Sequence, residues 1–310
     1  MSEKKYEMDL RHIDELKKEC AEHPDVLNYE DIRKLVPKLD GHEKLVNRVL
    51  RFLQVDEVNA VHGRWCDTPG PEFVRRMVDE DFHLSLAVDG AEVLDNLPGG
   101  AFVTVSNHPF GALDGISLIY LVTRTRPDFK VMVNMILNKI AAMRPNFIAV
   151  NAWHSDDPEA RRTSMAGVRE AISRLKEGHP IGFFPAGTMS KTNWKGQLID
   201  GPWQDSVLQI IKRAKVPVIP IFFHGSNSWW FNFLGHALWQ ARSIRLPAEV
   251  FRKRGKTLHI SVGEPITLED QQAHQESLKE YGEYLRGRLY ALRANPKRSA
   301  VIINPQAKKK

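Results

Sequence analysis

The chain has 310 residues, of which 42% are hydrophobic and 26% are charged. This length can bury a large core in one or two domains, and the composition is that of a globular protein rather than a disordered or fibrous one. The net charge of +6 favours acidic partners, namely anionic lipid, nucleic acid or an acidic carrier protein, although a solvated basic surface explains it equally well.

No segment of the sequence predicts export or membrane insertion. Residues 1–20 are charged throughout, unlike a signal peptide, and no window approaches the roughly 18 apolar residues of a spanning helix. The two cysteines, Cys20 and Cys66, are not spaced as a metal site, which favours a reduced, intracellular protein. We therefore expect a cytoplasmic protein that lies on the inner face of the cell membrane rather than crossing it.

Residues 1–83 are predicted to form an N-terminal helical region. Apolar residues recur there at the spacing of one helical face. They are Leu45, Val46, Val49, Leu50 and Leu53.

From residue 84 to residue 300, short apolar runs alternate with helix-length segments. The runs occupy 84–88, 101–106, 129–133, 147–150, 180–184, 216–223 and 258–262. The main helical segments are 115–124, 158–177, 203–214 and 267–293. This alternation predicts an α/β domain with a mostly parallel central sheet flanked by helices. Residues 301–310 are predicted to form a basic tail.

The first motif follows the apolar run that ends near residue 106. Asn107 and His108 come directly after it, and Asp114 follows six residues after the histidine. A histidine at the carboxyl end of a strand, with a carboxylate to orient its ring, is suited to general-base chemistry. Chance can supply one such spacing, so the pair needs support from the rest of the chain.

The second motif, Phe183–Lys191, also leaves the end of an apolar run. Pro185 and Gly187 predict a tight turn that exposes backbone N–H groups and the hydroxyls of Thr188 and Ser190. Such a turn beside His108 would stabilise the oxyanion of an acyl transfer. An ordinary strand-to-helix connection is the alternative.

Four ordered blocks resemble the glycerolipid acyltransferase superfamily of the lysophosphatidic acid type. They are Asn107-His-Pro-Phe-Gly-Ala-Leu-Asp114, Phe184-Pro-Ala-Gly-Thr188, Val216-Pro-Val-Ile-Pro220 and Val262-Gly-Glu-Pro-Ile266. The residues of the first two blocks are similar to those of the bacterial hemolysin-like branch. This branch includes O-acyltransferases that complete ornithine and glycine lipids. The resemblance covers roughly residues 84–266.

The departures from the superfamily pattern bear on the acceptor. Five residues separate His108 from Asp114, where four are usual, and Ala186 and Met189 replace a glutamate and an arginine. In the members that synthesise phosphatidic acid, the second block ends with an arginine that binds the phosphate of the acceptor. In this chain the corresponding run, 146–150, is followed by Asn151. An arginine fork suits phosphate, so its absence disfavours a lysophosphatidic acid acceptor.

Three cations remain candidates for the missing arginine's role. Lys139, Arg144 and Lys191 are the candidates, with Asn151 a further candidate for acceptor contact. The resemblance therefore implies O-acylation of a monoacylated amino-acid lipid, with lysophosphatidic acid acylation as the alternative.

By this resemblance, His108 removes the proton of the acceptor hydroxyl and Asp114 fixes the ring's tautomer. Histidine side chains titrate near pH 6.5, which suits a base at neutral pH. Asn107, Gly187, Thr188, Ser190 and Lys191 are expected around the oxyanion and acceptor. The donor is expected to be a fatty acyl thioester of coenzyme A or acyl carrier protein.

Alternative functions have less support in the sequence than acyl transfer does. No Gly-x-Ser-x-Gly elbow is present, so a serine hydrolase is disfavoured, while a thioesterase using activated water stays open. A metal site built from His108, Asp114 and His224 matches no standard ligand spacing, and no nucleotide-binding fingerprint occurs, so neither a metal nor a cofactor is expected. A catalytically inactive lipid-binding protein is the non-enzymatic alternative. The sequence contains no nucleic-acid-binding motif, so nucleic acid is not expected as a partner.

Two segments are candidates for contact with the membrane or the carrier. Trp229 and Trp230 open an aromatic stretch, 228–239, that suits the headgroup boundary, although a helix packed on the sheet explains it equally well. The N-terminal helices are the other anchor candidate. The basic segment 252–256 suits docking of an acidic carrier protein or anionic lipid, or is a solvated turn.

Overall fold

The computed structural model of the chain describes residues 13–151, 158–193, 197–228, 231, 245–294 and 300–304. Trp229, Trp230 and most of the aromatic stretch 228–239 lie outside the described residues, as do residues 305–310 of the expected tail.

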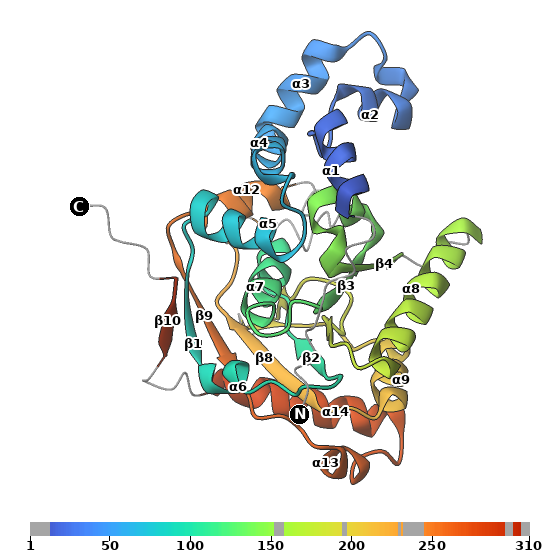
Figure 1. The fold of residues 1–310 in the computed structure, drawn as a ribbon, viewed down its shortest axis with the longest axis vertical. Helices are drawn as coiled ribbons and strands as arrows, with labels where there is room; N and C mark the ends of the chain where they lie inside the picture. The colour runs from blue at the N-terminus through green and yellow to red at the C-terminus, as the bar shows by residue number, and fades with distance from the viewer. Residues whose placement is uncertain are drawn as a thin grey trace.

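An eight-stranded sheet forms the centre of the molecule (Figure 1), in the order β10-β1-β9-β8-β2-β5-β3-β4. The strands are β1 (Ser85–Asp89), β2 (Val103–Ser106), β3 (Lys130–Asn134), β4 (Phe147–Val150), β5 (Ile181–Phe183), β8 (Val218–His224), β9 (Thr257–Val262) and β10 (Val301–Ile303). Five of the neighbouring pairs are parallel, and β8–β9 and β1–β10 are antiparallel. The predicted α/β fold with a mostly parallel sheet is therefore confirmed.

Helices cover both faces of the sheet. Those associated with its two buried clusters are α5 (Pro71–Arg76), α7 (Ala112–Val122) and α12 (Leu246–Phe251) on one face, and α8 (Pro158–Lys176), α9 (Asp205–Ala214) and α14 (Leu278–Ala291) on the other. Strand β8 shows why both faces are apolar: Ile219, Ile221 and Phe223 join the first cluster, whereas Val218 and Phe222 join the second. This alternation is the period of two of a strand buried on both sides.

Shorter elements connect these strands and helices in the part of the chain that the structure describes. They are η3 (Met77–Asp81), α6 (Ala91–Asp95), η4 (Met135–Lys139), η5 (Ala141–Asn146), the two-stranded β6 (Lys191–Thr192) with β7 (Leu198–Ile199), α13 (Leu268–Gln272) and η6 (Leu292–Ala294). Among the described residues, no helix is both long and apolar enough to cross a membrane.

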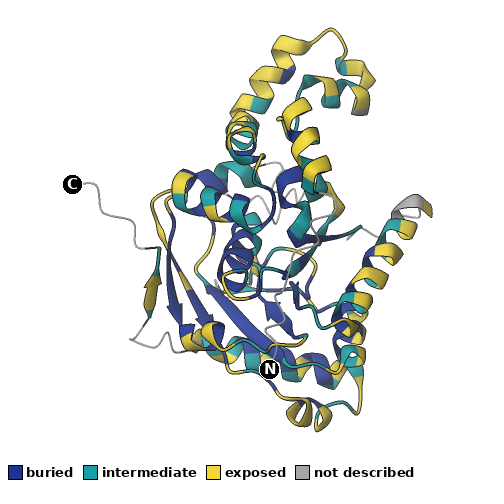
Figure 2. Ribbon diagram, viewed as in Figure 1, coloured by how far each residue is buried: buried dark blue, intermediate teal, exposed yellow. Residues whose placement is uncertain are grey.

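The N-terminal helices project from the α/β layers (Figure 1). They are α1 (Ile13–Glu22), α2 (Tyr29–Leu35), η2 (Pro37–Leu39), α3 (Glu43–Phe52) and α4 (Val55–Trp65). Cys20 and Val61 belong to the same buried cluster as the β1 residue Leu86, so the core is continuous between this region and the sheet. Figure 2 shows that α3 nevertheless remains largely exposed, whereas α2 is mostly intermediate in burial.

The end of the chain differs from the expected basic tail. Val301–Ile303 form β10, which pairs antiparallel with β1 at the edge of the sheet. Asn304 continues the contact, because its Nδ2 donates to the carbonyl of Leu84 at 2.8 Å. Three β-branched residues in a row fit an edge strand, and this local signal was outweighed in the prediction by the lysines that follow.

Candidate active site

The first motif forms the connection between β2 and α7. Gly111 precedes the helix with φ 74°, and a Cβ there would lie 2.7 Å from both Leu246 Cδ1 and Met189 Sδ. Glycine is required at this position for both its conformation and its lack of a side chain. The turn brings Asp114, in the first turn of α7, back towards His108.

His108 and Asp114 form a dyad at the carboxyl end of β2. His108 Nδ1 lies 3.0 Å from Asp114 Oδ2, and the carboxylate is fully buried whereas the His108 side chain is 21% exposed. The same Oδ2 accepts the backbone N–H groups of Phe110 at 2.8 Å and Gly111 at 2.9 Å. Asp114 therefore caps α7 and lies beside Nδ1 of His108 with the same carboxylate oxygen, and no hydrogen bond engages Nε2 of His108 among the described residues.

Burial and local contacts act in opposite directions on Asp114. Burial raises the pKa of its carboxyl, while His108 and the N–H groups of Phe110 and Gly111 lower it in part. A carboxylate at a helix N-terminus is further favoured by the positive end of the helix dipole. The dyad is thus built to stabilise positive charge on the histidine ring.

The other blocks of the sequence meet at this dyad. The Phe184 ring lies 4.3 Å from the His108 ring, centroid to centroid, and 6.5 Å from the Phe223 ring of β8. The Ser190 N–H donates to the His108 carbonyl at 2.9 Å. Motifs far apart in sequence therefore converge because their strands are neighbours in the parallel part of the sheet.

The side chain of Asn107 is hydrogen-bonded to the backbone of β8. Its Nδ2 donates to the Phe223 carbonyl at 2.9 Å, and its Oδ1 accepts the Phe223 N–H at 2.7 Å. The side chain is buried and extends the pairing of β2 with β8 by one step. We assign it to positioning of the His108 loop.

One backbone amide in the turn of the second motif is already engaged by a hydrogen bond within the turn. The Gly187 N–H donates to the Phe184 carbonyl at 2.9 Å, and a Cβ on Gly187 would lie 2.1 Å from Gln204 Nε2. Gly187 thus shapes the turn, which leaves its amide engaged. Among the described residues, the amides of Thr188 and Met189 have no acceptor, and Thr188 is exposed. The oxyanion role fits these two amides better than that of Gly187.

Ser190 is buried and faces a carboxylate that sequence reasoning missed. Its Oγ donates to Asp200 Oδ1 at 2.5 Å, and the same oxygen accepts the His108 N–H at 3.3 Å. Asp200 is itself held in place, because Arg286 Nη2 donates to its carbonyl and its N–H donates to the Tyr290 hydroxyl, both at 2.8 Å. Burial raises the pKa of Asp200, and Ser190 and His108 lower it in part. Only a Gly-Pro turn marks this position in the sequence.

Asp200→Ala is expected to lower kcat by about 10- to 100-fold with little change in KM, because it frees both Ser190 and the His108 backbone and misplaces the base. Steady-state kinetics at matched thermal stability measure the effect, with Ser190→Ala expected to fall between wild type and Asp200→Ala. Asp205→Ala, an exposed carboxylate in the next helix, is the control. A kcat within twofold of wild type in folded Asp200→Ala would contradict the positioning role.

Two of the three cations expected at the acceptor are paired elsewhere. Arg144 Nη1 and Nη2 lie 2.6 and 2.8 Å from the two carboxylate oxygens of Glu19 in α1. Lys139 Nζ lies 3.4 Å from Asp31 Oδ1 in α2. Asn151 is tied to α8, since its N–H donates to Ser164 Oγ at 3.0 Å and its carbonyl accepts from that hydroxyl at 3.1 Å. Acceptor contact by these residues stays a prediction.

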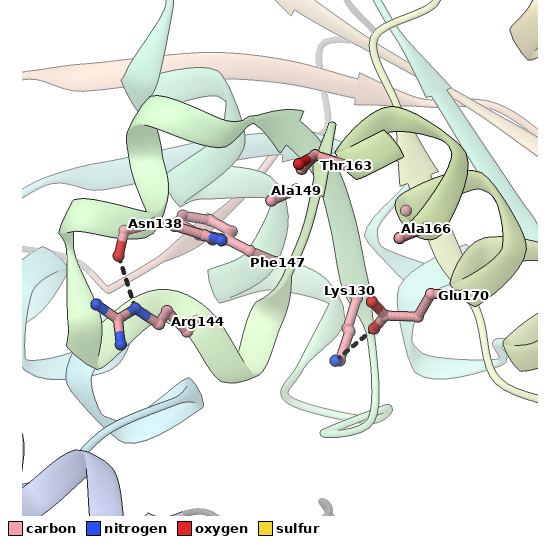
Figure 3. Close-up of a pocket in the computed structure, with 9 residues that line it drawn as sticks. Lys130, Asn138, Arg144, Phe147, Ala149, Thr163, Ala166 and Glu170 are labelled. Atoms are coloured by element: carbon pink, nitrogen blue, oxygen red, sulfur yellow. Dashed lines mark hydrogen bonds and ion pairs between the residues drawn. The ribbon is translucent and has the colours of Figure 1, made fainter. Parts of the chain in front are cut away.

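Arg144 lines a cavity of about 350 Å³ between β3, β4 and α8 (Figure 3). Lys130 also lines it and pairs with Glu170 at 2.9 Å. The lining, as far as the chain is described, includes no residue of the loop 107–114. The cavity and the dyad are therefore separate features.

The remaining candidates lie around the dyad or apart from it. Lys191 begins β6 and is exposed. Lys253 of the basic segment lies 4.6 Å from the Phe110 ring centroid and donates to the Ser226 carbonyl at 2.9 Å. His224 Nε2 is 2.8 Å from Ser261 Oγ in β9. Lys253 thus lies against the loop that carries Phe110, whereas His224 is engaged by the sheet.

A buried carboxylate–histidine pair beside exposed turn amides is the arrangement of an enzyme that activates a hydroxyl for acyl transfer. The sequence model described as "Acyltransferase" matches residues 30–297, and the chain belongs to this acyltransferase family.

Comparison with individual proteins gives three similarities. The chain is 26% identical over 267 residues to a lyso-glycine lipid O-acyltransferase of Bacteroides thetaiotaomicron, covering 84% of this chain and 92% of that protein. It is 29% identical over 182 residues to a protein of the same name from Phocaeicola vulgatus, covering 56% and 62%. The crystal structure of a 1-acyl-sn-glycerophosphate acyltransferase from Thermotoga maritima aligns with TM-score 0.46 and 17% identity over 81% of this chain and 88% of that chain.

Proposed function

We propose that this acyltransferase moves a fatty acyl group from a thioester donor to the hydroxyl of a monoacylated amino-acid lipid, with His108 as general base. The observation that carries the proposal is the 3.0 Å pairing of His108 Nδ1 with the buried Asp114 carboxylate at the end of β2. The names of the two bacterial relatives support an amino-acid lipid as the acceptor.

The geometry of the dyad supports the following chemistry. His108 Nε2 accepts the proton of the acceptor hydroxyl, and the oxygen attacks the thioester carbonyl carbon. The amides of Thr188 and Met189 stabilise the resulting oxyanion. The C–S bond then breaks as the carbonyl re-forms, and His108 returns the proton to the departing thiolate. Each turnover yields one ester and one free thiol, and no step needs a metal or cofactor.

The ion pairs formed by Arg144 and Lys139 favour this acceptor over lysophosphatidic acid. A phosphate monoester is best bound by an arginine fork or clustered cations. Arg144 and Lys139 are instead paired with Glu19 and Asp31 of the N-terminal helices. An amino-acid lipid brings a single carboxylate, for which one cation such as Lys191 suffices.

The donor and the location are part of the same proposal. Coenzyme A and acyl carrier protein are both acidic, and the basic segment 252–256 lies against the Phe110 loop, which suits either donor. We place the enzyme at the inner face of the cell membrane, where a lipid acceptor is embedded and a water-borne thioester can reach it.

Total-lipid profiling of cells with and without the gene tests the acceptor. Loss of the gene is expected to cause accumulation of a monoacylated amino-acid lipid, reversed by the wild-type gene but not by His108→Ala. Accumulation of lysophosphatidic acid instead would replace the proposed acceptor with the alternative one.

A further inference from the structure

The helix α3 carries an apolar stripe that faces outward. Leu45, Val49 and Phe52 are 52%, 46% and 73% exposed. At about 100° per residue they share one side of the helix, next to the side on which Val46 is buried. A helix of a globular protein ordinarily buries its whole apolar face, so this stripe is unaccounted for by the fold. Figure 2 shows the exposure of α3 at the end of the molecule.

Cations border the stripe on its other flank. Lys44, Arg48 and Arg51 lie within about 60° of one another on the helix, adjacent to the side of Phe52 and Leu45. None of the three forms an ion pair with any part of the chain that the structure describes. Glu43 is the single carboxylate of the helix. An apolar stripe beside unpaired cations is the arrangement of a helix that lies in the interface of an anionic bilayer.

A chain of contacts connects the stripe to the catalytic loop. The Arg245 guanidinium lies 5.9 Å from the centroid of the Phe52 ring. The next residue, Leu246, packs against Gly111, where an added Cβ would approach within 2.7 Å. Gly111 donates to the Asp114 carboxylate of the dyad. Successive contacts through Arg245, Leu246 and Gly111 therefore connect α3 to the loop that carries the dyad.

We propose that α3 is a membrane-docking helix: Leu45, Val49 and Phe52 enter the headgroup boundary of an anionic bilayer, and Lys44, Arg48 and Arg51 contact the lipid phosphates. The inference rests on the proposed function, because a lipid acceptor must be taken from a membrane. A second copy of the chain fits the stripe less well, since antiparallel pairing of two α3 helices about a two-fold axis would set the cations of each against those of the other.

Vesicle flotation of the full chain tests the docking helix. The vesicles are phosphatidylcholine alone or with about one-third phosphatidylglycerol. Leu45→Ser/Val49→Ser/Phe52→Ser is expected to lower binding to the anionic vesicles about tenfold or more, because the stripe no longer gains from leaving water. Val301→Ser/Ile302→Ser is the matched control, since both side chains are about half exposed on the edge strand β10.

A charge variant provides a test that leaves the apolar stripe and the packing of the helix intact. Lys44→Gln/Arg48→Gln/Arg51→Gln is expected to lower binding to anionic vesicles about tenfold. Raised salt should lower the binding of the wild type to these vesicles to a similar extent, because it screens the same cations. Lys279→Gln, an exposed cation on α14, should bind as the wild type does. Thermal unfolding of each variant establishes that it is folded.

Flotation needs no turnover, so it separates this inference from the proposed function. His108→Ala should float like the wild type while losing transferase activity. Flotation through α3 by a protein that acylates no lipid would uphold docking and overturn the proposed function. Unchanged flotation of both folded α3 variants would overturn docking, as would a dimer in solution that the apolar variant converts to monomers without a change in vesicle binding.

Discussion

His108→Ala is expected to reduce kcat for acyl transfer by about 10³-fold, the middle of the range that general-base assistance contributes. The substitution removes the proposed base, which would accept the hydroxyl proton and return it to the thiolate, while the turn amides and the sheet remain. The release of donor thiol, followed with a chromogenic disulfide, measures the rate. Mass spectrometry of the ester distinguishes transfer from hydrolysis.

The controls for this variant come from the same chain. His259→Ala removes an exposed histidine of β9 and should leave the rate unchanged. Asp114→Asn should fall nearly as far as His108→Ala, because it removes the charge that stabilises the imidazolium and weakens the cap of α7. Activity of folded His108→Ala within tenfold of wild type would show that another group is the base.

Asp128→Ala is expected to cost about 3–5 kcal/mol of the free energy of unfolding, because it leaves a buried guanidinium without its carboxylate. Arg126 Nε and Nη2 donate to the two oxygens of Asp128 at 3.0 and 2.8 Å, and both side chains are buried. The same guanidinium donates to the carbonyls of Pro98, Gly100 and Gly178. One ion pair thus ties three connections together at the end of the sheet opposite the dyad.

The pH dependence of this effect has a definite sign. Burial raises the pKa of Asp128, but hydrogen bonds from Arg126 and His179 outweigh it, so the pKa lies below its usual value. The stability it contributes is therefore present above the unfolded pKa of about 3.9 and is lost as the pH falls through the lower folded pKa. Urea unfolding should show a large difference between wild type and Asp128→Ala at neutral pH and a smaller one in acid.

Glu264→Ala, an exposed carboxylate after β9, should stay within about 0.5 kcal/mol of wild type at every pH. A difference between wild type and Asp128→Ala that grows as the pH is lowered would contradict the account of this ion pair.

The strands were predictable because their apolar runs are buried on both faces. Each of the seven runs forms a strand of the sheet, and the parallel order then brings the His108 and Phe184 motifs to one edge. The edge strand β10 was not predicted, because only its pairing with β1 distinguishes three β-branched residues from the start of a charged tail.

The roles of single residues in the site were harder to predict than its place. Asn107, Gly187 and Ser190 were expected at the substrate, yet their polar groups are engaged by Phe223, Phe184 and Asp200. A sequence shows which polar groups lie in a loop, but hydrogen bonds between segments decide which of them stay available. Asp200 was missed for the same reason, since its partner Ser190 is reached only through the folded β6–β7 hairpin.

The most direct test of the account is acyl transfer by the purified chain, with an acyl thioester and a lyso amino-acid lipid as substrates. We expect a diacylated lipid carrying a new ester, with one thiol released per ester and the rate lost in His108→Ala. An ester formed at the wild-type rate by folded His108→Ala, or formed only on lysophosphatidic acid, would contradict it.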